Sequence, residues 1–176
     1  KFDVLYVNHN VELCKKLKTV FPNKKVIFNT ISQADPYMER GLQNLKAIGV
    51  KIIRFFATEG FLPGSVEADA LIPQFVDESE YTDWNGDTVE VLAVCRAMPS
   101  RPIHTNAELY RMLSTVVPTK LVGPGNEGMI NAVGNISYED LKKSYRNSRV
   151  FFNLGTKPAG LVYTFVEALM TGCPIV

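Results

Sequence analysis

The first 72 residues alternate between short apolar runs and amphipathic stretches. The apolar runs cover 3–7, Lys25–Asn29 and 50–56, and apolar residues recur at helical spacing over Val11–Val20 and 36–48. Asp35-Pro36 is a strong helix start, because a capping residue precedes a proline in the first helical position. Gly49 marks the end of that helix, and 59–65, with two glycines and a proline, is a loop. Alternation of this kind predicts an α/β layer with parallel strands.

A second alternation follows the turn-rich segment 82–88. Strands are expected at 89–94, 120–122, 149–154 and from Pro174, and helices around 107–113, after Ser137 and at 164–171. Ser137 indicates a helix start, with Asp140 three positions on, near the positive end of the helix dipole. The order strand, loop, helix, strand at 149–176 is a βαβ unit, in which ligands bind where strands end and helices begin. We therefore predict an α/β fold with Rossmann-like parallel sheets and flanking helices, in two units, 1–77 and 78–176.

Composition narrows the function classes. The net charge is +1 with 21% charged residues, which argues against an electrostatically driven nucleic-acid binder. No run approaches the roughly 20 apolar residues that span a bilayer. The three cysteines lack CxxC spacing, and the two histidines lie far from them in sequence, so neither a zinc site nor a disulfide framework is indicated. We expect a reducing, cytoplasmic setting, and a position at the inner face of a membrane stays open.

Two arginines follow the strand expected at 89–94. Arg96 and Arg101 lie five residues apart on a loop between strand and helix. This arrangement suits a pyrophosphate, because guanidinium groups make charge-assisted, often bidentate hydrogen bonds to phosphate oxygens. The alternative interpretation is a pair of solvated loop charges. Positive charge near a helix start is mildly unfavourable, however, which favours a functional role.

Glycines and one carboxylate mark the other loops of the second unit. Gly123 and Gly125 form a G-x-G loop after the strand at 120–122, without the third glycine of a dinucleotide fingerprint. The polar loop 155–160 offers backbone amides to an anion. Glu167 is the one carboxylate in the helical run at 164–171. It is therefore a polar group beside a candidate anion site.

The segment from Glu167 to Val176, EALMTGCPIV, resembles the nucleotide-sugar-binding segment of retaining glycosyltransferases of the two-Rossmann-domain (GT-B) architecture, family 4 type. The resemblance implies that Glu167 contacts the ribose of the donor and that Arg96 and Arg101 hold its diphosphate, with Arg101 where lysine is usual. The loop with Gly123 and Gly125 is similar to the family's Leu-x-Gly-x-Gly segment. Residues 70–77 resemble its connection between domains, and 134–137 fall where the family contacts the nucleobase.

One position departs from the family pattern. Ala159 stands eight residues before Glu167, where the family usually has a second acidic residue that faces the donor sugar. The loop is instead similar to a subgroup with Thr-x-Pro-Ala. Contacts to the sugar and phosphates are then expected from Gly155, Thr156, Lys157, Gly160 and Tyr163.

The resemblance implies transfer of a sugar from a nucleoside diphosphate, of UDP or GDP type, to a hydroxyl of a glycan, lipid or small molecule. It implies no metal or other cofactor, and no general base can be named. Two alternatives remain: a non-catalytic nucleotide-sugar-binding module, which Ala159 favours, and a sugar-nucleotide epimerase on the same architecture. We expect the chain to be a piece of a longer protein, inactive alone and prone to homo-oligomers through exposed apolar surface.

Overall fold

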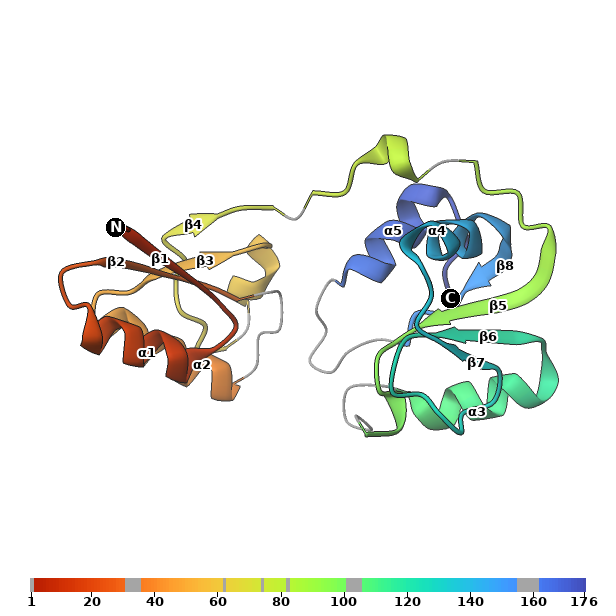
Figure 1. Ribbon diagram of the computed structural model, residues 1–176, viewed down its shortest axis with the longest axis horizontal. Coiled ribbons are helices and arrows are strands. Elements are labelled where there is room, and N and C mark those ends of the chain that lie inside the picture. Colours follow the sequence, from red (N-terminus) through yellow and green to blue (C-terminus); the bar gives the residue numbers. More distant parts are fainter. Residues whose placement is uncertain are drawn as a thin grey trace. The chain divides into compact units, whose positions relative to one another are not determined.

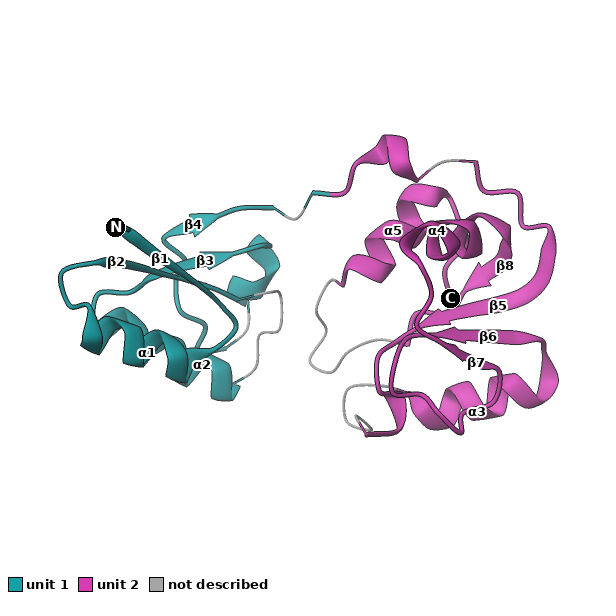
Figure 2. Ribbon diagram, viewed as in Figure 1, with its two compact units in different colours: residues 1–75 teal, residues 76–176 magenta. Residues whose placement is uncertain are grey.

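The computed structural model describes residues 2–30, 36–61, 63–73, 75–81, 83–100, 106–154 and 162–176. The chain forms two compact units, residues 1–75 and 76–176 (Figure 2). Their boundary falls two residues before the one expected from the sequence. Each unit contains a four-stranded, wholly parallel sheet flanked by helices (Figure 1). The expected α/β fold class, with Rossmann-like parallel sheets in two units, is thereby confirmed.

The sheet of the first unit has the order β1-β2-β3-β4. Its strands are β1 (Val4–Asn8), β2 (Lys25–Asn29), β3 (Lys51–Arg54) and β4 (Ala70–Leu71), and its helices are α1 (Val11–Val20), α2 (Pro36–Ala47) and the 3-10 turn η1 (Ala57–Phe61). Helices α1 and α2 lie on one face of the sheet (Figure 1). The strand residues that pack in the core with these helices are Val7, Val26, Phe28 and Ile52. On the opposite face Val4 and Tyr6 remain about half exposed, at 47% and 55%.

The sheet of the second unit has the order β7-β6-β5-β8. Its elements are η2 (Glu78–Glu80), β5 (Thr88–Val94), η3 (Met98–Ser100), α3 (Ala107–Val116), β6 (Thr119–Val122), β7 (Ala132–Gly134), α4 (Tyr138–Asn147), β8 (Ser148–Phe151) and α5 (Tyr163–Thr171). A further bridge from Phe151 to Ile175 adds the end of the chain beside β8. Helix α3 covers one face, and α4 and α5 cover the other (Figure 1).

This strand order places a topological switch point between β5 and β8. From β5 the chain runs outward through β6 and β7, and it then crosses to the other side of β5 as β8. The helices that follow β5 and β8, α3 and α5, therefore lie on opposite faces of the sheet. Open α/β sheets bind ligands at the carboxyl ends of the strands at such a switch point. In the first sheet the described strands lie side by side in their order along the chain, so they contain no such reversal.

The sequence analysis located most of the helices and strands, but it did not locate the short elements. Helix α1 and strand β2 have the expected bounds, and Ser137 caps α4 by accepting a hydrogen bond from the Asp140 amide. The strands expected at 50–56 and 149–154 are shorter, and β7 was not anticipated. Strand β7 has only three residues, too few for a periodic signal. No described helix has the length and apolar character needed to cross a membrane.

Candidate functional site

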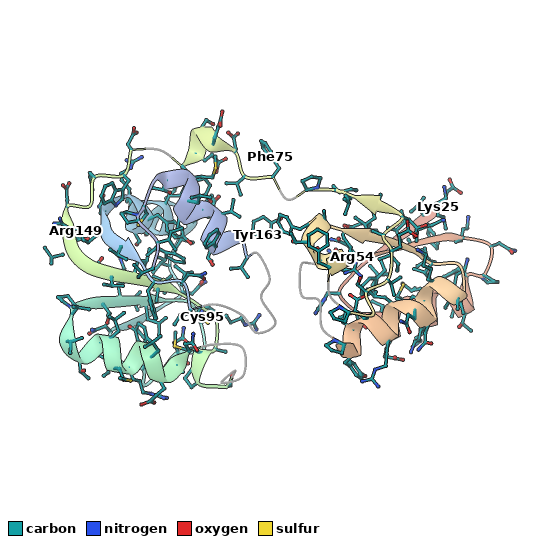
Figure 3. The ribbon with its side chains drawn as sticks, turned by 180° about the vertical axis from the view of Figure 1, so that it is seen from behind. Lys25, Arg54, Phe75, Cys95, Arg149 and Tyr163 are labelled. Atoms are coloured by element: carbon teal, nitrogen blue, oxygen red, sulfur yellow. The ribbon has the colours of Figure 1, made fainter. Side chains whose placement is uncertain are left out.

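The carboxyl ends of β5, β6 and β8 meet at one edge of the second sheet. Cys95, which directly precedes Arg96, and Tyr163, at the start of α5, lie at this same end of the unit (Figure 3). Arg96 follows β5, Gly123 and Gly125 follow β6, and Glu167 lies on the helix that follows β8. The structure thus places these predicted residues on the segments that follow the three strands. Five others, Arg101, Gly155, Thr156, Lys157 and Gly160, lie outside the described residues.

Arg96 is an exposed cation on a loop that the backbone holds firmly. The Cys95 amide donates to the Val122 carbonyl at 2.9 Å, and the Ala97 amide donates to the Pro124 carbonyl at 2.8 Å. Ala97 has a φ of 50°, a left-handed conformation that is costly for a residue with a side chain. Arg96 forms no ion pair with any residue the structure describes, so its guanidinium is available to an anion.

Asn126 joins the loop that carries Arg96 to the glycine loop. Its side chain is 1% exposed, and its amide nitrogen donates to the carbonyls of Cys95 at 2.6 Å and Gly123 at 2.8 Å. Its oxygen accepts from the Met98 amide at 2.8 Å. One buried side chain thus satisfies three backbone groups on two loops. The sequence analysis missed Asn126, because an asparagine beside glycine and proline is an ordinary turn residue.

The two glycines are required by close packing of these loops. Gly123 has a φ of 131°, and a Cβ at this position would lie 2.2 Å from the Cys95 carbonyl oxygen. Gly125 has a φ of 76°, and a Cβ there would lie 3.0 Å from the Cβ of Ala97. The Gly123 amide donates to the Gly134 carbonyl at 2.8 Å, and the Gly125 amide to a Glu127 carboxylate oxygen at 3.3 Å. These glycines bring the loops together, and a direct phosphate contact stays a prediction.

Glu167 lies in the second turn of α5, half-buried, with its carboxylate between two tyrosines. The Tyr81 hydroxyl donates to its Oε1 at 3.1 Å, and the Tyr145 hydroxyl donates to its Oε2 at 2.9 Å. Tyr138 in turn contacts the Tyr81 hydroxyl. Tyr163 stands four residues before Glu167 and is 48% exposed, so the two share a face of the helix. The sequence analysis anticipated neither tyrosine partner of Glu167, because Tyr81 and Tyr145 are 86 and 22 positions away in sequence.

A second cluster of charges, also missed by the sequence analysis, lies buried in the first unit. Arg54 is 1% exposed and donates to both oxygens of Glu39, at 2.8 and 2.7 Å, and to Glu59 at 3.3 Å. Glu59 also accepts from the Thr30 hydroxyl at 2.6 Å and from the amides of residues 55 and 56. These bonds fasten η1 to the sheet and leave Arg54 engaged with protein groups, which is a structural role.

The first unit also contains a cavity of about 400 Å³ between α1 and α2. Its polar lining includes His9, Lys15, Arg40 and Asn44. No residue that we predicted as a site residue belongs to it. Among the described ranges, no three side chains of metal-binding type come together.

The second unit is therefore a Rossmann-like domain with an exposed arginine directly after β5 and a tyrosine-bound carboxylate on the helix that follows β8. No family model matches the chain, and no curated protein is significantly similar to it.

Proposed function

We propose that the second unit binds a nucleoside-diphosphate sugar, and that the chain is the donor-binding part of a metal-independent retaining glycosyltransferase of the GT-B type. One observation carries this proposal: Arg96 and Glu167 come from the elements that follow β5 and β8, the two strands that flank the switch point. A nucleotide bound at this switch point would have its diphosphate beside a cation and its ribose beside a carboxylate.

In the transfer reaction the bond between the anomeric carbon and the phosphate oxygen breaks, and its electron pair leaves with the nucleoside diphosphate. A new bond forms between the anomeric carbon and the acceptor's hydroxyl oxygen, and the hydroxyl proton is released. Negative charge grows on the diphosphate in the transition state, and a fixed guanidinium stabilises that charge. Arg96 has this role in our proposal, because its loop is held in place by the Asn126 hydrogen bonds before any ligand arrives.

Glu167 binds the ribose hydroxyls in this proposal. Although both of its oxygens already accept a hydrogen bond from a tyrosine, an ionised carboxylate has about four acceptor positions. Each oxygen therefore keeps a position for a hydroxyl of the ligand. We expect Tyr163, on the same face of α5 and nearer its start, to contact the sugar or the phosphates of the donor.

The second candidate function is a nucleotide-sugar-binding module without catalysis. Ala159 favours it, because an acidic group that faces the donor sugar in the resembled family has no counterpart at that position. The two functions share the donor site and differ in turnover. Formation of free sugar or of a glycosylated acceptor from a radiolabelled donor by the full-length protein indicates the enzyme, whereas binding without product by the full-length protein indicates the module.

Calorimetric titration with UDP, GDP, ADP and their sugars tests the site. Loss of a hydrogen bond to a charged group is worth about 1.5–3 kcal/mol, so Arg96→Ala and Glu167→Ala should each raise the Kd by roughly 10- to 100-fold. Arg111→Ala and Glu108→Ala are matched controls, since these residues form only a surface pair on α3, and they should leave the Kd unchanged. Tight binding that survives both site substitutions removes the assignment.

A further inference from the structure

The carboxylate of Glu167 is held by two phenols from separate parts of the second unit. Tyr145 comes from α4 and is fully buried, and Tyr81 comes from the segment that precedes β5 and is 3% exposed. Each donates to a different oxygen of Glu167, at 2.9 and 3.1 Å. Helices α4 and α5 also pack against each other beside this cluster. The side chain of Glu167 is therefore fixed in rotation as well as in position.

The phenols remain donors at physiological pH. Burial, together with the neighbouring carboxylate, raises the pKa of Tyr145 far above its ordinary value. Burial, the Tyr138 hydroxyl and the Glu167 carboxylate raise the pKa of Tyr81 in the same direction. Both hydroxyls therefore stay protonated and donate to the carboxylate of Glu167. Charge-assisted hydrogen bonds to a carboxylate are stronger than those between neutral groups.

We propose that Tyr81 and Tyr145 are positioning residues that orient the two oxygens of Glu167 toward the two adjacent hydroxyls of a ribose. They thereby give the site a preference for ribonucleotides over deoxyribonucleotides. The inference rests on the proposed function, because it takes Glu167 to be the ribose-binding group. It adds that selectivity for the ribose depends on residues that do not themselves touch the nucleotide.

The geometry gives the reason for this selectivity. A carboxylate that rotates freely can turn one oxygen toward a single hydroxyl, and it would accept a 2′-deoxyribose at little cost. A carboxylate locked by one donor on each oxygen presents one remaining acceptor position on each side. Two neighbouring hydroxyls satisfy both positions. A deoxyribose leaves one of them unpaired in a half-buried site, which is unfavourable.

The test compares the Kd of UDP and GDP with that of their 2′-deoxy forms, by calorimetry. The wild-type chain should prefer the ribose form by about tenfold or more, as expected for a hydrogen bond to a charged group. Tyr81→Phe and Tyr145→Phe keep the aromatic rings and remove the hydroxyls, and each should reduce this ratio severalfold. Tyr6→Phe, an exposed position in the first unit, is the matched control and should leave the ratio unchanged.

The outcomes separate the two proposals. If the wild-type chain binds no nucleotide or shows no preference for ribose, Glu167 is not the ribose-binding group, and the proposed site fails together with this inference. A wild-type preference that persists in both Phe variants overturns the inference alone. Equal weakening of the ribose and deoxyribose forms also overturns it, because a merely structural role would lower both affinities together. If one variant fails to fold, as judged by its thermal unfolding midpoint, the other decides.

Discussion

Replacement of Asn126 by alanine should destabilise the second unit more than any ordinary loop substitution. The side chain makes three buried hydrogen bonds, to the Cys95 and Gly123 carbonyls and from the Met98 amide. At a net value of about 1 kcal/mol each, their loss lowers the free energy of unfolding by about 3 kcal/mol. This is a large part of the roughly 5–15 kcal/mol that stabilises a typical domain.

Urea unfolding followed by tryptophan fluorescence measures this loss in the correct unit. The chain has a single tryptophan, Trp84, whose indole donates to the Ser148 carbonyl at 2.8 Å inside the second unit. A urea dependence of about 1–3 kcal/mol per molar converts the expected loss into a midpoint lowered by about 1–3 M. The reporter therefore follows the unit that contains Asn126, whatever the first unit does.

Asn135→Ala, at an exposed loop position in the same unit, is the matched control. It should change the free energy of unfolding by less than about 0.5 kcal/mol. Asn126→Asp should rescue little, because it keeps the acceptor for the Met98 amide but places a carboxylate beside two carbonyl oxygens. A midpoint for Asn126→Ala that equals that of Asn135→Ala would show that the loops hold together without this side chain.

Two further predictions concern backbone geometry and pH. Gly123→Ala should destabilise the second unit by about 3 kcal/mol or more, because the new Cβ would overlap the Cys95 carbonyl. Gly128 has a φ of 86° but open space around it, so Gly128→Ala should destabilise the unit by only about 1–2 kcal/mol in the same urea assay. In the first unit, the pKa of Asp69 is lowered. Burial raises this pKa, but the hydrogen bonds from the Lys51 side chain and the Ile52 amide lower it by more. The stabilisation by Asp69 is therefore present above its ordinary pKa and lost as the pH falls through the lowered value. An Asp69→Asn variant, followed by circular dichroism, should differ from wild type by up to about 1 kcal/mol at pH 7 and converge with it in acid. A difference that persists unchanged at pH 2 contradicts this reasoning.

Part of the candidate site could be predicted because it depends on local order along the chain. A cation directly after an apolar strand, as with Arg96, must lie at the carboxyl end of that strand. In a parallel sheet the carboxyl ends of neighbouring strands share one edge. Glu167 could be assigned to a helix after β8 because apolar residues recur at helical spacing over 164–171. The partners that hold these residues could not be found in this way, because no short pattern relates Asn126 to Cys95, 31 positions away.

The sequence by itself determined the class of fold and most of the elements, because helix and strand periodicity and capping are properties of neighbouring residues. The bounds of α1 and β2 and the Ser137 cap of α4 follow from such local signals. Only the tertiary structure decided the strand order, the short strand β7 and the burial of Arg54 between two glutamates. These features depend on which distant segments meet when the chain closes its loops. That choice is made by the packing of whole sheets and helices, and a single stretch of sequence does not contain it.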